Sequence, residues 1–102
     1  MSTLHTVNKS PYTNNTLSSC LKVCAEDDGI LLLEDGVFGA TSSASLANEL
    51  QLLIKNGVKV YALINDLKAR GLEDKLPSHI EPIDYDTFVQ LTIEHRCVQS
   101  WY

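Results

Sequence analysis

Residues 27–36 read DDGILLLEDG, and this stretch decides the fold. Four consecutive apolar residues, 30–33, stand between two turns that contain aspartate and glycine. A short, unbroken apolar run bounded by turn residues is typical of a strand that is covered on both faces, as in a parallel sheet. We therefore predict a buried, parallel strand over residues 30–33.

The sequence on both sides of this strand alternates between strand and helix patterns. Further strands are predicted at residues 3–7 (TLHTV), 58–64 (VKVYALI), 80–83 (IEPI) and in the final CVQSWY. The first predicted helix runs from a cap at Asn14 or Asn15 to about Ala25, and the third from a cap at Asn65 or Asp66 to Gly71. The second and fourth helices are predicted at residues 44–55 and 84–95. Residues 37–45 are expected to be irregular or weakly helical.

This alternation predicts right-handed crossovers between parallel strands, with helices on the faces of the sheet. The expected fold class is α/β, a small flavodoxin-like three-layer domain with a mainly parallel five-stranded sheet. Residues 1–102 are expected to form one domain, because this length suits a single core. In such sheets, sites lie beyond the carboxyl ends of the strands.

Composition and charge exclude several classes of function. The formal net charge is −5 and the eight basic residues are scattered, which disfavours direct binding to nucleic acid. No apolar run approaches the ~20 residues that span a bilayer, and the N-terminal residues do not resemble a secretory signal. The three cysteines do not resemble a disulfide framework. We expect a cytoplasmic protein with free thiols and no membrane contact.

Two of the cysteines, Cys20 and Cys24, lie four residues apart on the first predicted helix. On a helical projection that starts from Leu17, Cys24 falls within the apolar stripe and Cys20 falls at its margin. We therefore expect Cys24 to fill the core and Cys20 to face a groove or a partner. No neighbouring residue identifies either as an activated nucleophile, since Lys22 acts only through a longer-range field.

Other chemical sites find little support. A zinc site made of Cys20, Cys24, His95 and Cys97 lacks the usual C-x2–4-C knuckle, so we expect no metal. The sequence has no glycine-rich phosphate loop and no G-x-S-x-G motif, so no cofactor is expected. Trp101 and Tyr102 at the C-terminal end cover either the domain's own sheet edge or a partner.

Taken in order, several stretches resemble the DsrH/TusB family of the DsrE/DsrF/DsrH-like group. The resemblance covers essentially the whole chain without large insertions, and its pieces are LHTVNKSP (4–11), LLLEDGV (31–37), VYALINDLKARGL (60–72), IDYDTFVQLT (83–92) and VQSWY (98–102).

The resemblance implies a flavodoxin-like fold and a place as the smallest subunit of a heterohexamer with DsrE/TusD-like and DsrF/TusC-like chains. Such a complex passes persulfide sulfur to a DsrC/TusE-like carrier, for tRNA wobble-uridine 2-thiolation or for intracellular sulfur oxidation. DsrH-type chains carry a cysteine in the first helix, where Cys20 stands. Cys20 is thus the candidate persulfide acceptor, and it favours the sulfur-oxidation branch. The chain would belong to a sulfurtransferase complex without being an enzyme on its own.

A second function of a different class stays open. In it the chain is a non-catalytic structural subunit that completes the hexamer and shapes the docking of the carrier. The interface candidates are then Asp35, Gly36, Trp101 and Tyr102.

Overall fold

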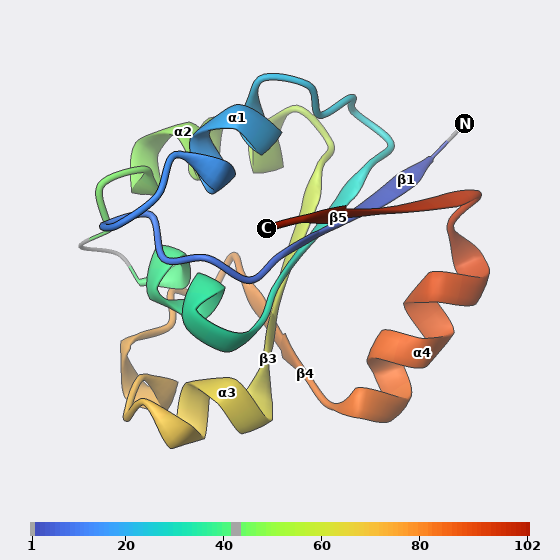
Figure 1. Ribbon diagram of the computed structural model, residues 1–102. Coiled ribbons are helices and arrows are strands. Elements are labelled where there is room, and N and C mark those ends of the chain that lie inside the picture. Colours follow the sequence, from blue (N-terminus) through green and yellow to red (C-terminus); the bar gives the residue numbers. More distant parts are fainter. Residues whose placement is uncertain (1, 42–43) are drawn as a thin grey trace.

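Five strands form one sheet in which every neighbouring pair is parallel (Figure 1). The structure is a computed structural model that describes residues 2–41 and 44–102. The sheet has the order β4-β3-β2-β1-β5, and the strands are β1 (Thr3–Val7), β2 (Gly29–Leu32), β3 (Lys59–Leu63), β4 (Glu81–Ile83) and β5 (Cys97–Trp101). The predicted α/β class and the five-stranded parallel sheet are therefore confirmed.

The central strand is β2, and it confirms the buried, parallel strand that the DDGILLLEDG stretch predicted. All four of its residues are buried, and it pairs with β1 on one side and with β3 on the other. Its side chains alternate between two cores, because Ile30 and Leu32 pack in one cluster and Leu31 packs in the other.

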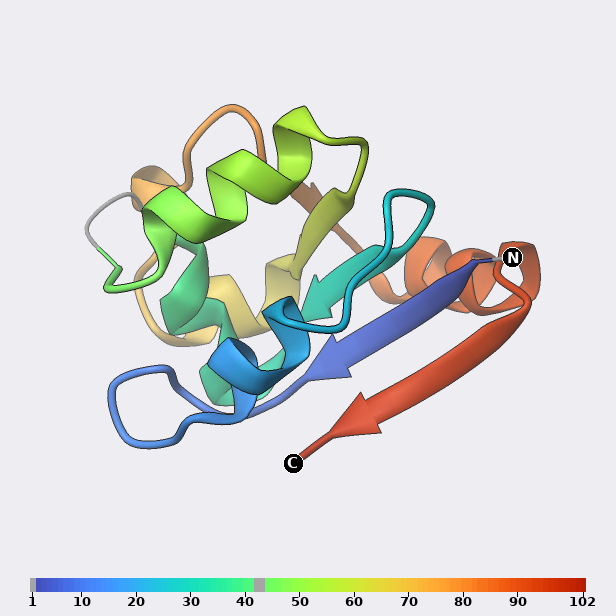
Figure 2. The ribbon, with the colours of Figure 1, turned by 90° about the horizontal axis from the view of Figure 1, so that it is seen from above.

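The helices cover the two faces of the sheet unequally (Figure 2). Strands β1 to β4 follow one another across the sheet, so right-handed crossovers place their connecting helices on one face. The step from β4 back across the sheet to β5 places α4 on the other face. The α-helices are α1 (Thr16–Leu21), α2 (Ala47–Lys55), α3 (Ile64–Ala69) and α4 (Tyr85–Glu94), and the 3-10 helices are η1 (Glu34–Ala40) and η2 (Glu73–Lys75).

This strand order is a variation on the expected flavodoxin-like arrangement. In flavodoxin the order is 2-1-3-4-5, and the switch point lies between β1 and β3. Here β1 lies between β2 and β5, so the order reverses beside β1. The larger core, under α1, α2 and α3, includes Val7, Leu17, Cys20 and Leu67, whereas the smaller core under α4 includes Leu4, Tyr61 and Leu91.

The first helix is shorter than the sequence pattern indicated, since α1 ends at Leu21 instead of near Ala25. The carbonyl of Cys20 accepts the backbone N–H of Val23 (3.1 Å) and the S–H of Cys24 (3.3 Å). In a continuing α-helix the Cys20 carbonyl would accept the backbone N–H of Cys24. The bonds that it accepts instead show that the helix has ended before Cys24. A helical projection therefore misplaces Cys24.

The predicted caps of the third helix are also wrong. Helix α3 begins directly at Ile64, with Leu63 in the capping position and no side-chain cap. Asp66 turns instead to the neighbouring connection, where its Oδ2 accepts the backbone N–H of Glu34 at 2.7 Å.

The segment before α2 also differs from its prediction. Helix α2 begins at Ala47, three residues later than expected, and residues 34–40 form the 3-10 helix η1. Residues 42–43, which belong to the stretch predicted to be irregular, lie outside the described residues.

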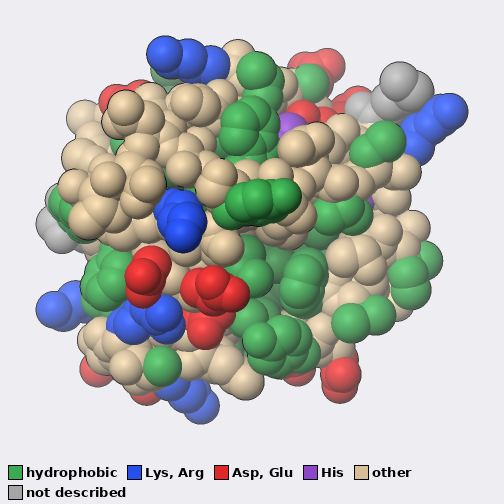
Figure 3. All heavy atoms as spheres, in the orientation of Figure 1, with side chains coloured by type: hydrophobic (Ala, Val, Ile, Leu, Met, Phe, Trp, Pro, Cys, Tyr) green, Lys and Arg blue, Asp and Glu red, His purple; other side chains and the backbone are tan. Residues whose placement is uncertain are grey.

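Helix α4 matches its prediction closely and carries an exposed apolar surface. Asp84 caps it by accepting the backbone N–H of Thr87 at 2.8 Å. Spaced four residues apart on its outer side are three exposed side chains, which we call the α4 stripe: Tyr85, Val89 and Ile93. Figure 3 shows hydrophobic side chains gathered over this helix and along its border with the sheet.

Candidate functional site

The two neighbouring thiols lie in contact, but their exposures are the reverse of the expected ones. Cys20 has no exposed surface, whereas Cys24 is partly exposed. Their Sγ atoms are 3.9 Å apart. The expectation that Cys24 fills the core and Cys20 lies at the margin was therefore wrong, because α1 ends between them and turns Cys24 outward. The assignment of Cys20 as persulfide acceptor stays a prediction. Solvent does not reach this thiol in the isolated chain.

The contact between the two sulfurs shifts their pKa values in opposite directions. The hydrogen bond with Cys24 and then burial raise the pKa of the Cys20 thiol. The same hydrogen bond, with Cys20 as donor, lowers the pKa of Cys24 and outweighs burial and the nearby negative charge of Asp28, which act the other way. Cys24 is thus the member of the pair that more readily becomes a thiolate.

A buried polar network lies beside the thiols. The His5 ring binds Asp28 through Nε2 at 2.8 Å and Trp101 through Nδ1 at 3.0 Å. Because the indole N–H only donates, Nδ1 must accept and Nε2 must carry the proton given to Asp28. His5 is therefore held as one neutral tautomer with both ring nitrogens occupied.

Asp28 is the buried anion of this network. Burial alone would raise its pKa, but hydrogen bonds from the Ala25 N–H, the His5 ring and the Thr3 N–H together lower the pKa below its usual range. These contacts are 2.8 to 3.0 Å long. Asp28 thus joins β1, the segment after α1 and the start of β2.

His5, Cys20 and Cys24 also bring three potential metal ligands together, with ligand atoms within 4.8 Å of one another. A soft cation at this place would need His5 to give up one of its two hydrogen bonds. His95 and Cys97, which the sequence analysis considered with the thiols, do not belong to this group. His95 binds the Leu91 carbonyl through Nδ1 at 2.8 Å, and Cys97 is exposed on β5.

The interface candidates Asp35 and Gly36 lie at the rim formed by the carboxyl ends of the strands. Arg70 forms an ion pair with the exposed Asp35 at 2.9 Å and a second, longer one with Asp66 at 3.6 Å. Gly36 is buried, and a Cβ atom there would collide with the Val7 carbonyl oxygen. Asp35 therefore has surface to offer a partner, whereas Gly36 serves the packing of η1 on β1.

The two terminal aromatic residues have different roles. Trp101 packs against the larger core and donates its indole N–H to His5, so it covers the chain's own sheet edge. Tyr102 is 84% exposed. Of the two, Tyr102 is the one available to a partner.

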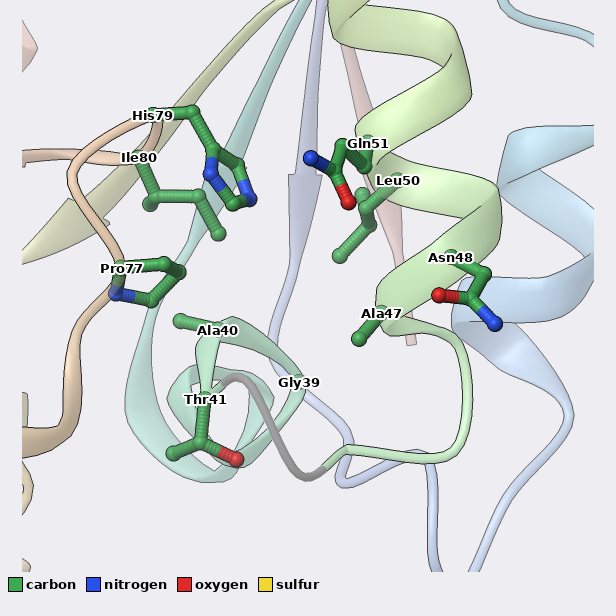
Figure 4. A pocket seen from close by; sticks show the side chains of 10 residues that line it. All are labelled: Gly39, Ala40, Thr41, Ala47, Asn48, Leu50, Gln51, Pro77, His79 and Ile80. Atoms are coloured by element: carbon green, nitrogen blue, oxygen red, sulfur yellow. The ribbon is translucent and has the colours of Figure 1, made fainter.

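A small cavity of about 70 Å³ lies between α2 and the connection that precedes β4 (Figure 4). Its lining combines apolar residues with four polar ones, Thr41, Asn48, Gln51 and His79. Pockets for small organic ligands are usually about 300 Å³ or larger. The cavity does not include either thiol of the pair.

His5 and Asp28 are the site residues that the sequence analysis missed. In the sequence, Asp28 is recognisable only as part of a turn, and His5 only as a residue of a predicted strand. The pairing of β1 with β2 brings them together across 23 residues of sequence. Neither residue type nor spacing in the sequence indicates this contact.

Comparison with solved structures identifies the class of fold. The crystal structure of the ychN protein from E. coli superposes with a TM-score of 0.83 at 19% identity, covering 98% of this chain and 99% of that one. A protein of unknown function from Methanobacterium thermoautotrophicum superposes with a TM-score of 0.75 at 14% identity, covering 96% of each chain. The fold is therefore one that occurs in small bacterial and archaeal proteins.

Sequence comparison then gives the family. The profile of the family described as DsrH like protein matches residues 9–98. Protein TusB of Escherichia coli O1:K1 is 40% identical over 98 residues, which cover 96% of this chain and 99% of that protein. The chain belongs to the DsrH-like family, and the resemblance to DsrH and TusB sulfur-relay proteins is confirmed. None of the helices formed by the described residues has the length and hydropathy of a membrane-spanning segment.

Proposed function

We propose that the chain is a subunit of a cytoplasmic, heterohexameric sulfur-relay complex, with DsrE/TusD-like and DsrF/TusC-like chains as its partners. In this complex, persulfide sulfur passes to a DsrC/TusE-like carrier. The observation that carries the proposal is the family match over residues 9–98, together with 40% identity to TusB over nearly the full length of both chains. The net charge of −5 agrees with transfer to a carrier protein instead of direct contact with tRNA.

Two exposed regions support a role in assembly. The α4 stripe exposes more than half of each of its side chains, Tyr85, Val89 and Ile93. Edge strand β5 is exposed over residues 97–100, and among the described residues it pairs with β1 alone, which leaves its other edge open to a partner. Contiguous apolar surface and an unprotected sheet edge are features that association with another chain covers.

The two pathways of the family are supported by different features. Identity to TusB supports tRNA wobble-uridine 2-thiolation, whereas a cysteine at position 20 supports sulfur oxidation. Neighbouring genes for sulfite-reductase subunits are expected in the second case and not in the first.

The burial of Cys20 favours a second candidate function, that of a structural subunit. A relay thiol must be reached by the thiolate of the carrier, and Cys20 has no exposed surface. In this alternative the chain completes the hexamer and shapes the docking surface, with Asp35 and Tyr102 as contact residues and without carrying sulfur itself.

Co-expression with the two partner chains tests membership of the complex, and it does not depend on any thiol. A stable complex that contains all three chains, measured by size-exclusion chromatography with light scattering, is the expected result. A chain that elutes alone, with the partners assembled without it, would refute the proposal. A variant without cysteines that still assembles but slows sulfur delivery to the carrier would support the relay role over the structural one.

A further inference from the structure

We infer that Cys24, and not Cys20, is the thiol of this chain that first receives sulfur from an external persulfide donor, with Cys20 as a positioning residue behind it. The inference rests on the proposed relay function and names its acceptor. It follows from the end of α1 at Leu21, which separates the environments of the two thiols.

Access distinguishes the two sulfurs. A donor persulfide must bring its outer sulfur into contact with the attacking Sγ, and only Cys24 of this pair has exposed surface. Cys20 lies in the larger core, with Leu17 and Val7 in the same cluster. For Cys20 to react first, α1 would have to open.

Contact with Cys20 gives the Cys24 sulfur a buried hydrogen-bond donor, which an isolated surface thiol lacks. The Cys20 sulfur lies 3.9 Å from the Cys24 sulfur, within reach of an S–H···S hydrogen bond. Because Cys20 is buried, no water competes for its proton. A thiolate at Cys24 is thus stabilised by a neighbour that stays protonated, while the carbonyl of Cys20, 3.3 Å away, accepts the S–H when Cys24 is neutral.

The transfer step is balanced without an added oxidant. The Cys24 thiolate attacks the outer sulfur of a donor R–S–SH, and a bond forms between Sγ and that sulfur. The S–S bond of the donor breaks, and R–S⁻ leaves with the electron pair. The products are Cys24–S–SH and the donor thiolate, and the same exchange in reverse passes the sulfur to a carrier thiolate.

Cys97 provides the matched control, because it is an exposed thiol on β5 that does not belong to the thiol pair. The purified full chain is incubated with glutathione persulfide, and the added sulfur is located by mass spectrometry of alkylated peptides. The wild type and Cys97→Ser are expected to carry one sulfur at residue 24, and Cys24→Ser is expected to lose at least about nine-tenths of this adduct.

The role of Cys20 is measured by the pH dependence of loading. Cys20→Ser keeps a donor group and is expected to load Cys24 over a pH range close to that of the wild type. Cys20→Ala lacks the donor, and its loading curve is expected to move to higher pH. A purely structural role would change protein stability in both variants without moving the curve of Cys20→Ala.

Three outcomes would overturn the inference. Sulfur at Cys20 in the Cys24→Ser variant would reassign the acceptor and leave the relay function standing. Sulfur confined to Cys97 would show that exposure alone governs loading. If no thiol of the chain is loaded, both the inference and a sulfur-carrying role fail, while membership of the complex is decided separately by co-expression. Circular dichroism confirms that each variant is folded before loading, and Cys24→Ala replaces Cys24→Ser if the latter is not.

Discussion

At the scale of single residues, the position of one sulfur depends on where a short helix ends. Leu17 and Cys20 are both fully buried, so the buried side of α1 is centred between them. Projecting the same helix to residue 24 would place Cys24 in the core. The turn at residues 22–23 instead moves Cys24 to the surface while keeping its sulfur against Cys20.

This arrangement predicts unequal labelling of the three cysteines. In the native chain, iodoacetamide is expected to modify Cys97 and Cys24 and to spare Cys20, because alkylation requires direct access to the sulfur. Peptide mass spectrometry after timed labelling gives the three rates. Adding denaturant should bring the rate at Cys20 up to those of the other two. Native labelling of Cys20 at the rate seen for Cys97 would contradict the structure.

The Asp28 network predicts a loss of stability when its carboxylate is removed. Asp28→Asn replaces an anion that accepts three hydrogen bonds in a buried place, and the expected cost is about 1–3 kcal/mol in the free energy of unfolding at pH 7. The measurement is urea unfolding followed by circular dichroism.

The same variant also tests the pH dependence. The folded-state pKa of Asp28 is below the unfolded value of about 4, so its contribution is complete above that pH and is lost as pH falls through the folded value. The difference between wild type and Asp28→Asn should therefore shrink below about pH 4. A difference that stays constant down to pH 2 would rule out this account.

At the scale of elements, η1 depends on a glycine that lies directly against β1. Gly36→Ala would bring Cβ into collision with the Val7 carbonyl oxygen, which belongs to the backbone and cannot easily move. The expected loss is at least about 3 kcal/mol, or failure to fold. Gly71→Ala is the control, because it meets no atom within 4 Å and suffers only its positive φ of 66°, at about 1 kcal/mol. Denaturant midpoints that rank the two variants the other way would contradict this packing.

The elements differ in how well the sequence predicted them, for a physical reason. The unbroken apolar run predicted β2 and the helical pattern over residues 84–95 predicted α4; both signals are local, and both elements were confirmed. The start of α3 was missed because Asp66 uses its carboxylate to hold Glu34, a partner 32 residues away. At the end of α1 the Cys20 carbonyl accepts hydrogen bonds from the Val23 backbone N–H and from the Cys24 thiol, a side-chain contact. Such nonlocal or side-chain contacts leave no periodicity in the sequence.

At the scale of the whole molecule, the order β4-β3-β2-β1-β5 leaves α4 as the one helix of the described residues on its face of the sheet (Figure 2). One helix covers a smaller core there, and the α4 stripe stays exposed. The thiol pair belongs to the opposite, larger core. The exposed α4 stripe and the thiol pair thus lie on opposite faces of the sheet.

This separation predicts which face the partner subunits bind. Ile93→Glu adds a charge to a side chain that is 71% exposed, so the isolated chain should change in stability by less than about 0.5 kcal/mol. In co-expression with the two partner chains, the variant should lose at least about nine-tenths of the complex recovered with wild type, because the charge would be buried without a counterion. Leu52→Glu on α2 is the matched control, since Leu52 is 62% exposed but lies on the other face of the sheet. If Leu52→Glu blocks assembly and Ile93→Glu does not, the partners bind over α2, beside the thiols, and the two functions share one surface.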